Sequence, residues 1–474
     1  MSLTQVSYSM IQGAVYNVLD YGVSSTAIAA TNSTAFQAAI NDAKITGGTV
    51  FIPAGSYTYD VGMLIDKGNV QLVGEGHNAT ILTYTGLGAG IIIGDSGGDY
   101  YGTSGWFKLI GTNAASMGIR VLGCTAGVLD GIWVKGFVKA FTPSDGLPGS
   151  GGAAGIWLNS RNLTGNFVLS YTIQNCIIEQ NFTNIDFTGS VSGATNDIHI
   201  VRNKIRNCTG GYNIYANIVS TTWSIEENDL EANAVNNPSV LIAGATVVSF
   251  NKNYVEQVQA GPALVFNSST NVNINVQSVT VTNNNFVTSV AGSYNYSIEW
   301  YGNNNSGITV SNNYFNGWLY ALKLAGTYTS MVVEGNNYLT TNISDFGGTY
   351  YNCRFENGTT DVTFSTLVKG GMWLAQSGFG TKFDTTSNTT YQVPVGACRI
   401  VYTGAGSSVF TLPAATAGRE LLITNQTSYV ITSASSNIVP VAGGSASTAL
   451  LSGSAGKWAL LVANGSTWQI MAAN

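Results

Sequence analysis

The stretch that decides the fold reads IVRNKI at residues 200–205, and it returns as IEENDL at 225–230 and FNKNYV at 250–255. Each copy has an apolar residue, two spacers, an asparagine, one spacer and a second apolar residue. Seven copies run from Thr172 to Tyr338, and internal repeats of this length are typical of solenoids. Because the copies are rich in β-branched, aromatic and asparagine residues, we expect an all-β right-handed parallel β-helix with one coil per repeat.

The repeated asparagine is expected to shape the coil. Asparagine tolerates the left-handed backbone conformation that tight bends need, and its amide can bond an equivalent amide one coil away. Stacked coils lie about 4.8 Å apart, which suits a ladder of side-chain amides. We therefore interpret seven asparagines, spaced by 28, 25, 25, 31, 29 and 23 residues, as structural: Asn175, Asn203, Asn228, Asn253, Asn284, Asn313 and Asn336.

The composition of the 474-residue chain favours an all-β, surface-exposed fibre or spike. Only 9% of the residues are charged, 57 are glycine, and the formal net charge is −6. This balance, without any run of Lys or Arg, argues against nucleic acid and anionic membranes as partners. No stretch is apolar enough to span a bilayer, and the first 20 residues do not resemble a signal peptide.

The cysteine content predicts free thiols. Five cysteines cannot all pair, and no close spacing indicates a disulfide framework or a metal site. We expect mostly buried thiols and folding in a reducing compartment, such as a host cytoplasm, for Cys124, Cys176, Cys208, Cys353 and Cys398.

The chain divides into three parts by its patterns. Residues 1–30 are expected to form an N-terminal arm with a strand at 15–21, and residues 31–375 the β-helix. A pattern of strands about ten residues apart predicts a C-terminal β-sandwich over residues 376–474, after a hinge at 381–390.

One amphipathic helix is predicted in this β-rich chain, over residues 33–44. It places Phe36, Ala39, Ile40 and Ala43 on one face behind Ser33 as its N-cap. A helix at this point would cover the open end of the solenoid, where strand edges and the core are otherwise exposed.

Three segments near the N-terminus carry a resemblance to a known family. They read YNVLDYG at residues 16–22, TAFQAAINDA at 34–43 and GGTVFIPAGSYTY at 47–59. With the repeats, they resemble the pectate-lyase-like β-helix superfamily as it occurs in bacteriophage tailspikes, over about residues 12–360. The runs VFTLPAATAGRELLITNQ at 409–426 and KWALLVANGSTWQI at 457–470 are similar to C-terminal domains of phage fibres and spikes, which trimerise the spike or contact glycans.

Alignment on the asparagines predicts a pair of neighbouring carboxylates. Three positions after the asparagine the aligned residues are Ile178, Arg206, Glu231 and Glu256, and alternation along the strands turns them to solvent. Glu231 and Glu256 would lie about 5 Å apart at the backbone, the separation of carboxylates in retaining glycosidases. Their repulsion would raise the pKa of one and leave an acid and a base.

Further charged residues surround this candidate catalytic pair. Arg206 would hold one carboxylate ionised or bind an acidic sugar. The residues one position after the asparagine are expected to line the same groove: Lys204, Asp229 and Tyr254. The residues one position before the asparagine add further charges: Arg202, Glu227 and Lys252. In a purely structural alternative, the charges form cross-strand ion pairs that set register, each worth about 0–1 kcal/mol when exposed.

Aromatic residues in neighbouring coils favour a sugar ligand, because flat rings stack on the apolar faces of sugars. We expect Trp300 to face the core and Trp318 or Tyr320 to act as sugar platforms. A salt bridge between Glu299 and Lys323 is also expected. Further acids lack a carboxylate at the matching offset in the next coil: Asp197, Glu179, Asp186 and Glu226.

Other candidate features do not indicate a different chemistry. The GDSGG string at residues 94–98 is interpreted as a glycine-rich turn, because a serine triad needs a histidine and neither His77 nor His199 has a suitable setting. The loop at 142–152, with Asp145 at its tip, would overhang a groove. No cofactor or metal site is predicted, and the missing polygalacturonase and pectate lyase signatures argue against pectin as substrate.

The family resemblance implies a homotrimeric tailspike that binds a bacterial capsule or O-antigen and cleaves it by endoglycosidic hydrolysis. It implies a virion tail protein that acts at the bacterial surface and joins the tail or baseplate through the N-terminal arm. Two alternatives stay open. One is a lyase, in which Arg206, Lys204 or Lys252 neutralises a uronate, and the other is an adhesin that binds glycan without cleaving it.

Overall fold

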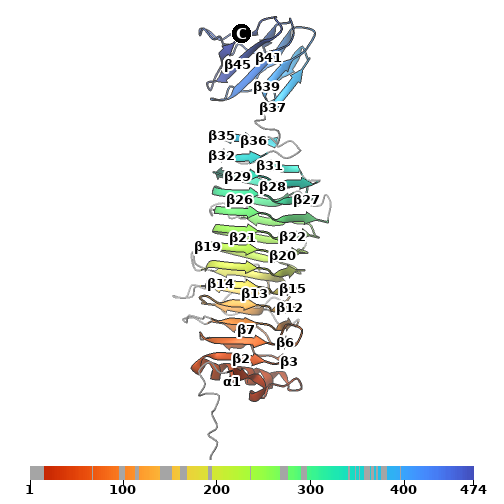
Figure 1. Cartoon of the computed structure of the whole chain (residues 1–474), viewed down its shortest axis with the longest axis vertical. Coiled ribbons are helices and arrows are strands. Elements are labelled where there is room, and N and C mark those ends of the chain that lie inside the picture. Colours follow the sequence, from red (N-terminus) through yellow and green to blue (C-terminus); the bar gives the residue numbers. More distant parts are fainter. Residues whose placement is uncertain are drawn as a thin grey trace, which may run out of the picture. The chain divides into compact units, whose positions relative to one another are not determined.

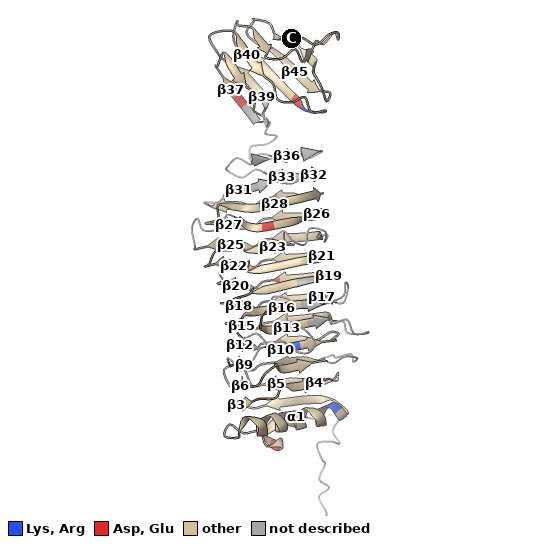
Figure 2. Ribbon diagram, turned by 180° about the vertical axis from the view of Figure 1, so that it is seen from behind, with Lys and Arg blue, Asp and Glu red and all other residues tan. Residues whose placement is uncertain are grey.

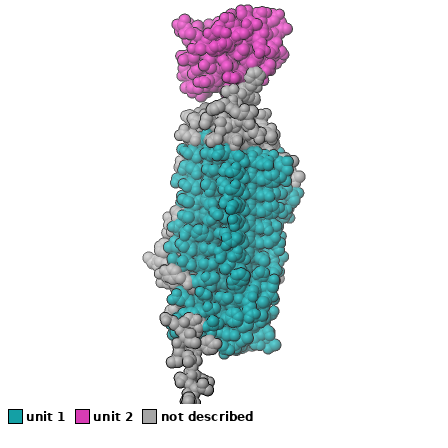
Figure 3. Space-filling view, in the orientation of Figure 1, with its two compact units in different colours: residues 1–372 teal, residues 373–474 magenta. Residues whose placement is uncertain are grey.

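The computed structural model of the chain describes its helix, nearly all of its coils and its C-terminal strands (Figure 1). The described residues are 15–66, 68–94, 102–112, 117–138, 152–160, 168–189, 195–234, 236–266, 276–289, 296–339, 342–346, 349–351, 353–356, 363–364, 368–369, 372–374, 382–394 and 397–474. They fall into two compact units, residues 1–372 and 373–474, which Figure 3 colours teal and magenta.

The first unit is a right-handed parallel β-helix, as expected. Each coil contributes strands to two sheets, and all strand pairs of the coils are parallel. One face is an eleven-stranded sheet, here called sheet B, of short strands in chain order: β3 Gly55–Tyr59, β6 Thr80–Tyr84, β9 Lys108–Gly111, β12 Trp133–Lys135, β15 Ile177–Glu179, β18 Lys204–Arg206, β20 Asp229–Glu231, β22 Tyr254–Gln257, β25 Asn285–Thr288, β27 Tyr314–Asn316 and β30 Asn337–Leu339.

The remaining coil strands form a 25-stranded sheet, here called sheet A, which contains two stacks of parallel strands joined within the longest ones. Its strands are β1 Val15–Asn17, β2 Gly48–Ile52, β4 Met63–Ile65, β5 Val70–Gly74, β7 Ala89–Ile93, β8 Thr103–Gly105, β10 Met117–Leu122, β11 Val128–Asp130, β13 Ala154–Ser160, β14 Val168–Gln174, β16 Thr183–Gly189, β17 Thr195–Val201, β19 Ile214–Glu226, β21 Val240–Asn251, β23 Leu264–Phe266, β24 Gln277–Thr282, β26 Tyr296–Ser311, β28 Tyr320–Thr329, β29 Val332–Glu334, β31 Asn342–Phe346, β32 Thr349–Tyr351, β33 Arg354–Glu356, β34 Thr363–Phe364, β35 Val368–Lys369 and β36 Met372–Leu374.

A ladder of buried asparagines fixes the register of the coils at the turn between sheet A and sheet B. Asn253 shows the pattern: its Oδ1 accepts from the backbone N–H and the side-chain amide of Asn228, both at 3.0 Å. Its own amide donates to Ile225 O at 2.8 Å and to Asn284 Oδ1 at 3.1 Å. The same arrangement links Asn203, Asn228, Asn253, Asn284, Asn313 and Asn336.

Two details of the predicted repeat are wrong. In the first copy the ladder position is held by Cys176, whose backbone N–H donates to Asn203 Oδ1 at 2.9 Å, and not by Asn175. The left-handed conformation also belongs to the residue before each ladder position, as at Asn175 before Cys176, with φ 54°, and at Lys252 before Asn253, with φ 55°. The ladder amides therefore act through hydrogen bonds, while the preceding residue makes the bend.

The interior of the coils is filled by stacked apolar side chains. On sheet B the inward rings of Phe286, Phe315 and Tyr338 lie nearly parallel, with centroids 5.2 and 5.5 Å apart. All five cysteines are free thiols, as expected, and all but Cys398 are buried. Such stacking joins each coil mainly to its two neighbours.

The capping helix α1 runs over Ala29–Thr46 and is longer than the predicted span of 33–44. Ser33 lies inside the helix and is not its N-cap; its hydroxyl instead accepts from the backbone N–H groups of Asp60 and Val61 at 2.9 and 3.0 Å. Gln37 bonds both the N–H and the C=O of Leu64. The helix thus pairs polar backbone groups that the first coil would otherwise leave open.

The segment before the helix also differs from the prediction of one strand over 15–21. Only β1 is extended, and a 3-10 helix, η2, follows at Val18–Tyr21. Asn17 ends the strand because its side chain accepts from the backbone N–H of Leu19 at 3.0 Å.

The second unit is a sandwich of a six-stranded and a four-stranded sheet that share one hydrophobic core. Successive strands alternate between the sheets at its start, and the later pairings are mostly antiparallel. The strands are β37 Lys382–Thr386, β38 Thr390–Gln392, β39 Ala397–Tyr402, β40 Ser408–Thr411, β41 Glu420–Asn425, β42 Ile431–Ser433, β43 Ile438–Val439, β44 Ala449–Leu451, β45 Lys457–Ala463 and β46 Trp468–Ala473.

The ladder generates a stability prediction. Asn253→Gly should lower the free energy of unfolding by about 3 kcal/mol, because Asn228 N–H and Ile225 O lose their partners in a buried site. Asn283→Gly should change it by no more than about 0.5 kcal/mol, because Asn283 has φ 58° and glycine adopts this conformation without strain. Thermal melting followed by circular dichroism measures both. Equal losses in the two variants would contradict the assigned roles.

Candidate functional site

The outward face of sheet B brings the predicted acidic pair together. Arg206 pairs in register with Glu231, and Glu231 with Glu256, on three consecutive strands. The parallel column two residues earlier contains Lys204, Asp229 and Tyr254. The residues between the columns are buried and hold the strands to the core: Ile205, Leu230 and Val255. Alternation along short strands thus turns six polar side chains outward.

The side chains of these columns make polar contacts within and between the strands. Lys204 Nζ lies 3.1 Å from Asp229 Oδ2 and 3.7 Å from Glu231 Oε2. Arg206 Nη1 lies 3.8 Å from the same Glu231 oxygen. On the next coil, the Tyr254 hydroxyl donates to Glu256 Oε2 at 3.1 Å. Glu231 is therefore approached by two cations, while Glu256 is oriented by a phenol.

Glu179 belongs to the same column, which the sequence alignment missed. The structure pairs Glu179, and not Ile178, with Arg206. Its carboxylate is buried, accepts from Arg206 Nε at 2.8 Å and from Trp133 Nε1 at 3.0 Å. The available signal was the spacing of five between apolar residues, since Ile173 and Ile178 repeat the interval of Ile200 and Ile205.

Burial and a carboxylate on the same strand set the protonation of Glu231. Burial, followed by the negative charge of Asp229, raises the pKa of Glu231 above its ordinary value of 4.5, against the opposing effect of Lys204. Repulsion from Glu256 was expected to cause this shift, but Asp229 is the acid responsible. Burial and the bond to Glu256 also raise the pKa of Tyr254 to about 12, so its hydroxyl stays a donor.

One pair among the surrounding charges, Lys252 and Glu227, is a cross-coil ion pair of the kind that the structural alternative predicts. Lys252 Nζ lies 3.4 Å from Glu227 Oε1 in an exposed pair, and Arg202 Nε donates to Asn175 Oδ1 at 3.2 Å. Elsewhere, Asp197 Oδ1 lies 3.0 Å from His199 Nε2. A structural contribution therefore accompanies any chemistry of this face.

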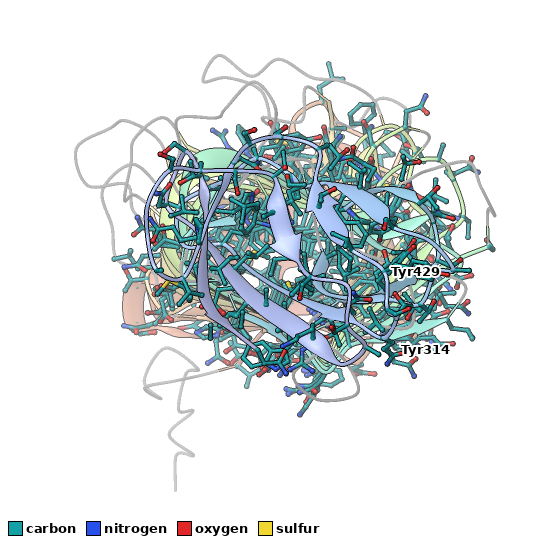
Figure 4. The ribbon with its side chains drawn as sticks, turned by 90° about the horizontal axis from the view of Figure 1, so that it is seen from above. Tyr314 and Tyr429 are labelled. Carbon is teal, nitrogen blue, oxygen red and sulfur yellow. The ribbon has the colours of Figure 1, made fainter. Side chains whose placement is uncertain are left out.

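The predicted sugar platforms are only partly suited to that role. Trp318 is 1% exposed, so its prediction as a platform is wrong: the ring packs in the core, as that of Trp300 does. Tyr320 is half-buried and stacks on Tyr296 with centroids 5.4 Å apart. Tyr314, labelled in Figure 4, extends the column of Tyr254 two coils onward.

A second polar cluster lies on sheet A. The predicted pair of Glu299 and Lys323 is confirmed at 3.6 Å, on residues that are paired in register. The Tyr301 hydroxyl donates to Glu299 Oε2 at 2.7 Å, and Lys323 Nζ donates to the Tyr301 oxygen at 3.1 Å. In the view of Figure 2, few parts of the ribbon carry the colours of charged residues.

Several sequence features lie outside the described residues. They are the loop with Asp145 and residues 95–98 of the GDSGG string. Within the ranges that the structure describes, no group of three or more His, Cys, Asp or Glu side chains has the geometry to hold a metal ion. In those ranges no helix is both long and apolar enough to cross a membrane.

Comparison with known proteins defines the class of this fold. A family model described as rhamnogalacturonase A/epimerase, pectate lyase-like, matches residues 15–123, and no curated protein sequence matches. The Dettilon tailspike protein (gp208) is similar in structure, with a TM-score of 0.53 and 12% identity over 95% of this chain and 76% of that one. The chain is thus a right-handed parallel β-helix, a fold that it shares with this tailspike, and its residues 15–123 are similar to the pectate lyase-like family.

Two further solved structures are similar at lower scores. The Geobacillus virus E2 protein ORF18 is 12% identical over 76% of this chain, with a TM-score of 0.45. This chain spans 61% of the length of that protein. The catalytic unit of a GH87 alpha-1,3-glucanase from Streptomyces thermodiastaticus is 15% identical over 70% of this chain and 68% of that one, with a TM-score of 0.46.

The buried part of the network generates a second prediction. Arg206→Met should lower the free energy of unfolding by about 2 kcal/mol, because the buried Glu179 carboxylate loses a charged hydrogen bond. Lys252→Met should cost less than about 1 kcal/mol, because its ion pair is exposed. Melting temperatures of the two variants, measured side by side, test this difference. A loss for Lys252→Met as large as that for Arg206→Met would refute it.

Proposed function

We propose that this protein is a bacteriophage tailspike that binds a bacterial surface polysaccharide, a capsule or O-antigen, and cleaves it by endoglycosidic hydrolysis. The observation that carries the proposal is the alignment of Glu231 and Glu256 on adjacent coils of a solvent-facing sheet, with a raised pKa on the first. The tailspike fold supports the same assignment.

In the proposed reaction Glu231 is the general acid. Its raised pKa favours the protonated form compared with an ordinary glutamate, and protonation of the leaving glycosidic oxygen requires that form. Glu256 is the second carboxylate, and it acts as nucleophile or as base toward water. The Tyr254 hydroxyl bond orients Glu256, and Asp229 favours the protonated state of Glu231.

The remaining residues of the face would bind the polymer. Lys204 and Arg206 each lie within 4 Å of Glu231 and present donors to sugar hydroxyls or carboxylates. Tyr320, stacked on Tyr296, would offer a ring for a sugar farther along the chain.

The proposal includes the assembly of the spike. Three copies would form a homotrimer, the N-terminal arm would join the phage tail or baseplate, and the sandwich would trimerise the spike or contact glycans. The protein would fold in the host cytoplasm and act outside, on the bacterial surface. Light scattering tests the trimer, and a particle of the mass of one 49.7 kDa chain would refute it.

Cleavage assays test the reaction. The protein should shorten at least one member of a panel of capsular and lipopolysaccharide glycans, and Glu231→Gln or Glu256→Gln should reduce the rate about 100-fold or more. Glu227→Gln, which alters the exposed pair with Lys252, is the matched control and should keep the rate within about twofold. Fragment sizing and mass spectrometry provide the measurement.

Each other outcome of this assay selects a different function. Products with a double bond that absorbs in the ultraviolet would select a lyase, in which Lys204 or Arg206 neutralises a uronate. Glycan that is bound but intact after long incubation would select an adhesin. Full activity in both glutamine variants would refute the assigned site.

The pH dependence of cleavage tests the role of Glu231. Activity should fall as pH rises through the raised pKa of Glu231, because the acid loses its proton. Asp229→Asn removes a negative charge and should move this alkaline limb to lower pH, whereas Lys204→Met removes a positive charge and should move it to higher pH. Profiles of kcat/KM against pH measure both. Shifts in the same direction would contradict the assignment.

A further inference from the structure

Sheet B carries a second set of outward residues that the proposed reaction does not use. Trp106, Lys108, Trp133 and Lys135, here called the basic-aromatic patch, lie on or beside β9 and β12. Lys108 pairs in register with Trp133, and β12 pairs with the strand of Glu179. The patch and the acidic column therefore share one face of the solenoid.

Among the described residues neither lysine of the patch lies within salt-bridge distance of a carboxylate, although Glu179 pairs in register with Lys135. Lys108 Nζ lies 3.3 Å from the centre of the Trp133 ring, and Lys135 Nζ lies 5.6 Å from it. The adjacent carboxylate of Glu179 already accepts from Trp133 Nε1 and Arg206 Nε. Burial and the charge of Lys135 lower the pKa of Lys108, against the opposing attraction of Glu179. A bound anion would relieve this repulsion.

Trp106 is held in an unusual way beside these lysines. Its backbone is left-handed, with φ 63°, a conformation that bulky residues rarely adopt. Trp106 as a whole is 47% exposed, and its ring lies over Gly131, where an added Cβ would come within 2.9–3.1 Å of three ring atoms. The same left-handed bend recurs at Gly131 and Asn175 on the next coils, so what distinguishes this position is its exposed indole, which is suited to stacking on a sugar.

We propose that the basic-aromatic patch is a subsite for a sugar that bears an anionic group. The ammonium groups of Lys108 and Lys135 bind the anion, and the Trp106 ring stacks on the sugar ring. The inference rests on the proposed function and deepens it, since it makes the substrate an acidic polysaccharide.

The position of the patch also orients the polymer. Trp133 and Asp229 lie in the same column of sheet B. Three successive strand pairings separate them, from β12 to β15, from β15 to β18 and from β18 to β20. At about 4.8 Å per coil this separation is about 14 Å, which an oligosaccharide spans and a single sugar does not. The polymer would therefore run along sheet B, parallel to the solenoid axis.

Glycan binding by the full-length Glu231→Gln variant, which leaves the polymer intact, tests the subsite. The probe is an array of purified capsular polysaccharides and O-antigens, with each uronate-containing member present in native and carboxyl-reduced form and with phosphate-bearing members included. We expect the tightest binding to acidic members. If the anion is a carboxylate, carboxyl reduction should weaken binding about tenfold, equivalent to one charged contact. If the anion is a phosphate, the phosphate-bearing members should bind most tightly.

Adding Lys108→Met and Lys135→Met should weaken binding to the native acidic glycan about tenfold and leave the neutral form within about twofold. Lys457→Met, in the second unit, is the control and should change neither. Trp106→Ala should weaken both forms by the same factor, about fivefold. Raising the salt from 0.1 to 1 M should remove the effect of the lysines, because the Debye length falls from about 10 to about 3 Å.

The subsite is overturned if the array retains only neutral glycans or none, or if the double lysine variant weakens charged and neutral forms equally. Its failure is distinguishable from failure of the proposed function. Cleavage at an unchanged rate by Lys108→Met/Lys135→Met in the otherwise natural chain refutes the subsite alone. Binding of acidic glycans through the patch without cleavage by the natural chain refutes the hydrolase and leaves the subsite.

Discussion

The register of the coils depends on the buried asparagine ladder. Each ladder oxygen accepts two hydrogen bonds from the coil before it, and each amide donates to the coil after it, as at Asn253. A slip by one residue would break this ladder and turn the outward side chains inward. The adjacency of Glu231 and Glu256, and the ion pairs of Lys204 and Arg206, follow from this one constraint.

The repeat made much of the fold predictable from the sequence, because a periodic pattern converts sequence offsets into spatial neighbours. It gave the register of Glu231 with Glu256, and that of Glu299 with Lys323. The error came where Cys176 replaced the ladder asparagine beside Asn175. The pattern of asparagines then favoured the wrong residue, and the buried Glu179 was left out of its column.

The burial and the pKa of individual side chains could not be predicted from their positions relative to the repeated asparagine, because they depend on packing within and between coils. The burial of Trp318 depends on the packing of neighbouring coils, which its spacing does not reveal. The pKa of Glu231 depends on how far its carboxyl is buried and on Asp229 two residues earlier, rather than on the next coil. Trp106 has a left-handed backbone at a position that asparagine, glycine or long polar residues hold in later coils.

The joint between coils is nearly identical from Asn203 to Asn336, whereas the outward residues differ from coil to coil. The distance along the solenoid axis between two outward groups of one column is therefore a whole number of coil spacings. Duplication or deletion of one coil between Trp133 and Asp229 would change the distance between them by one coil spacing. The hydrogen bonds between neighbouring coils would keep the same pattern. In the proposed function, such a change would match the solenoid to a polymer of different repeat length without a new core.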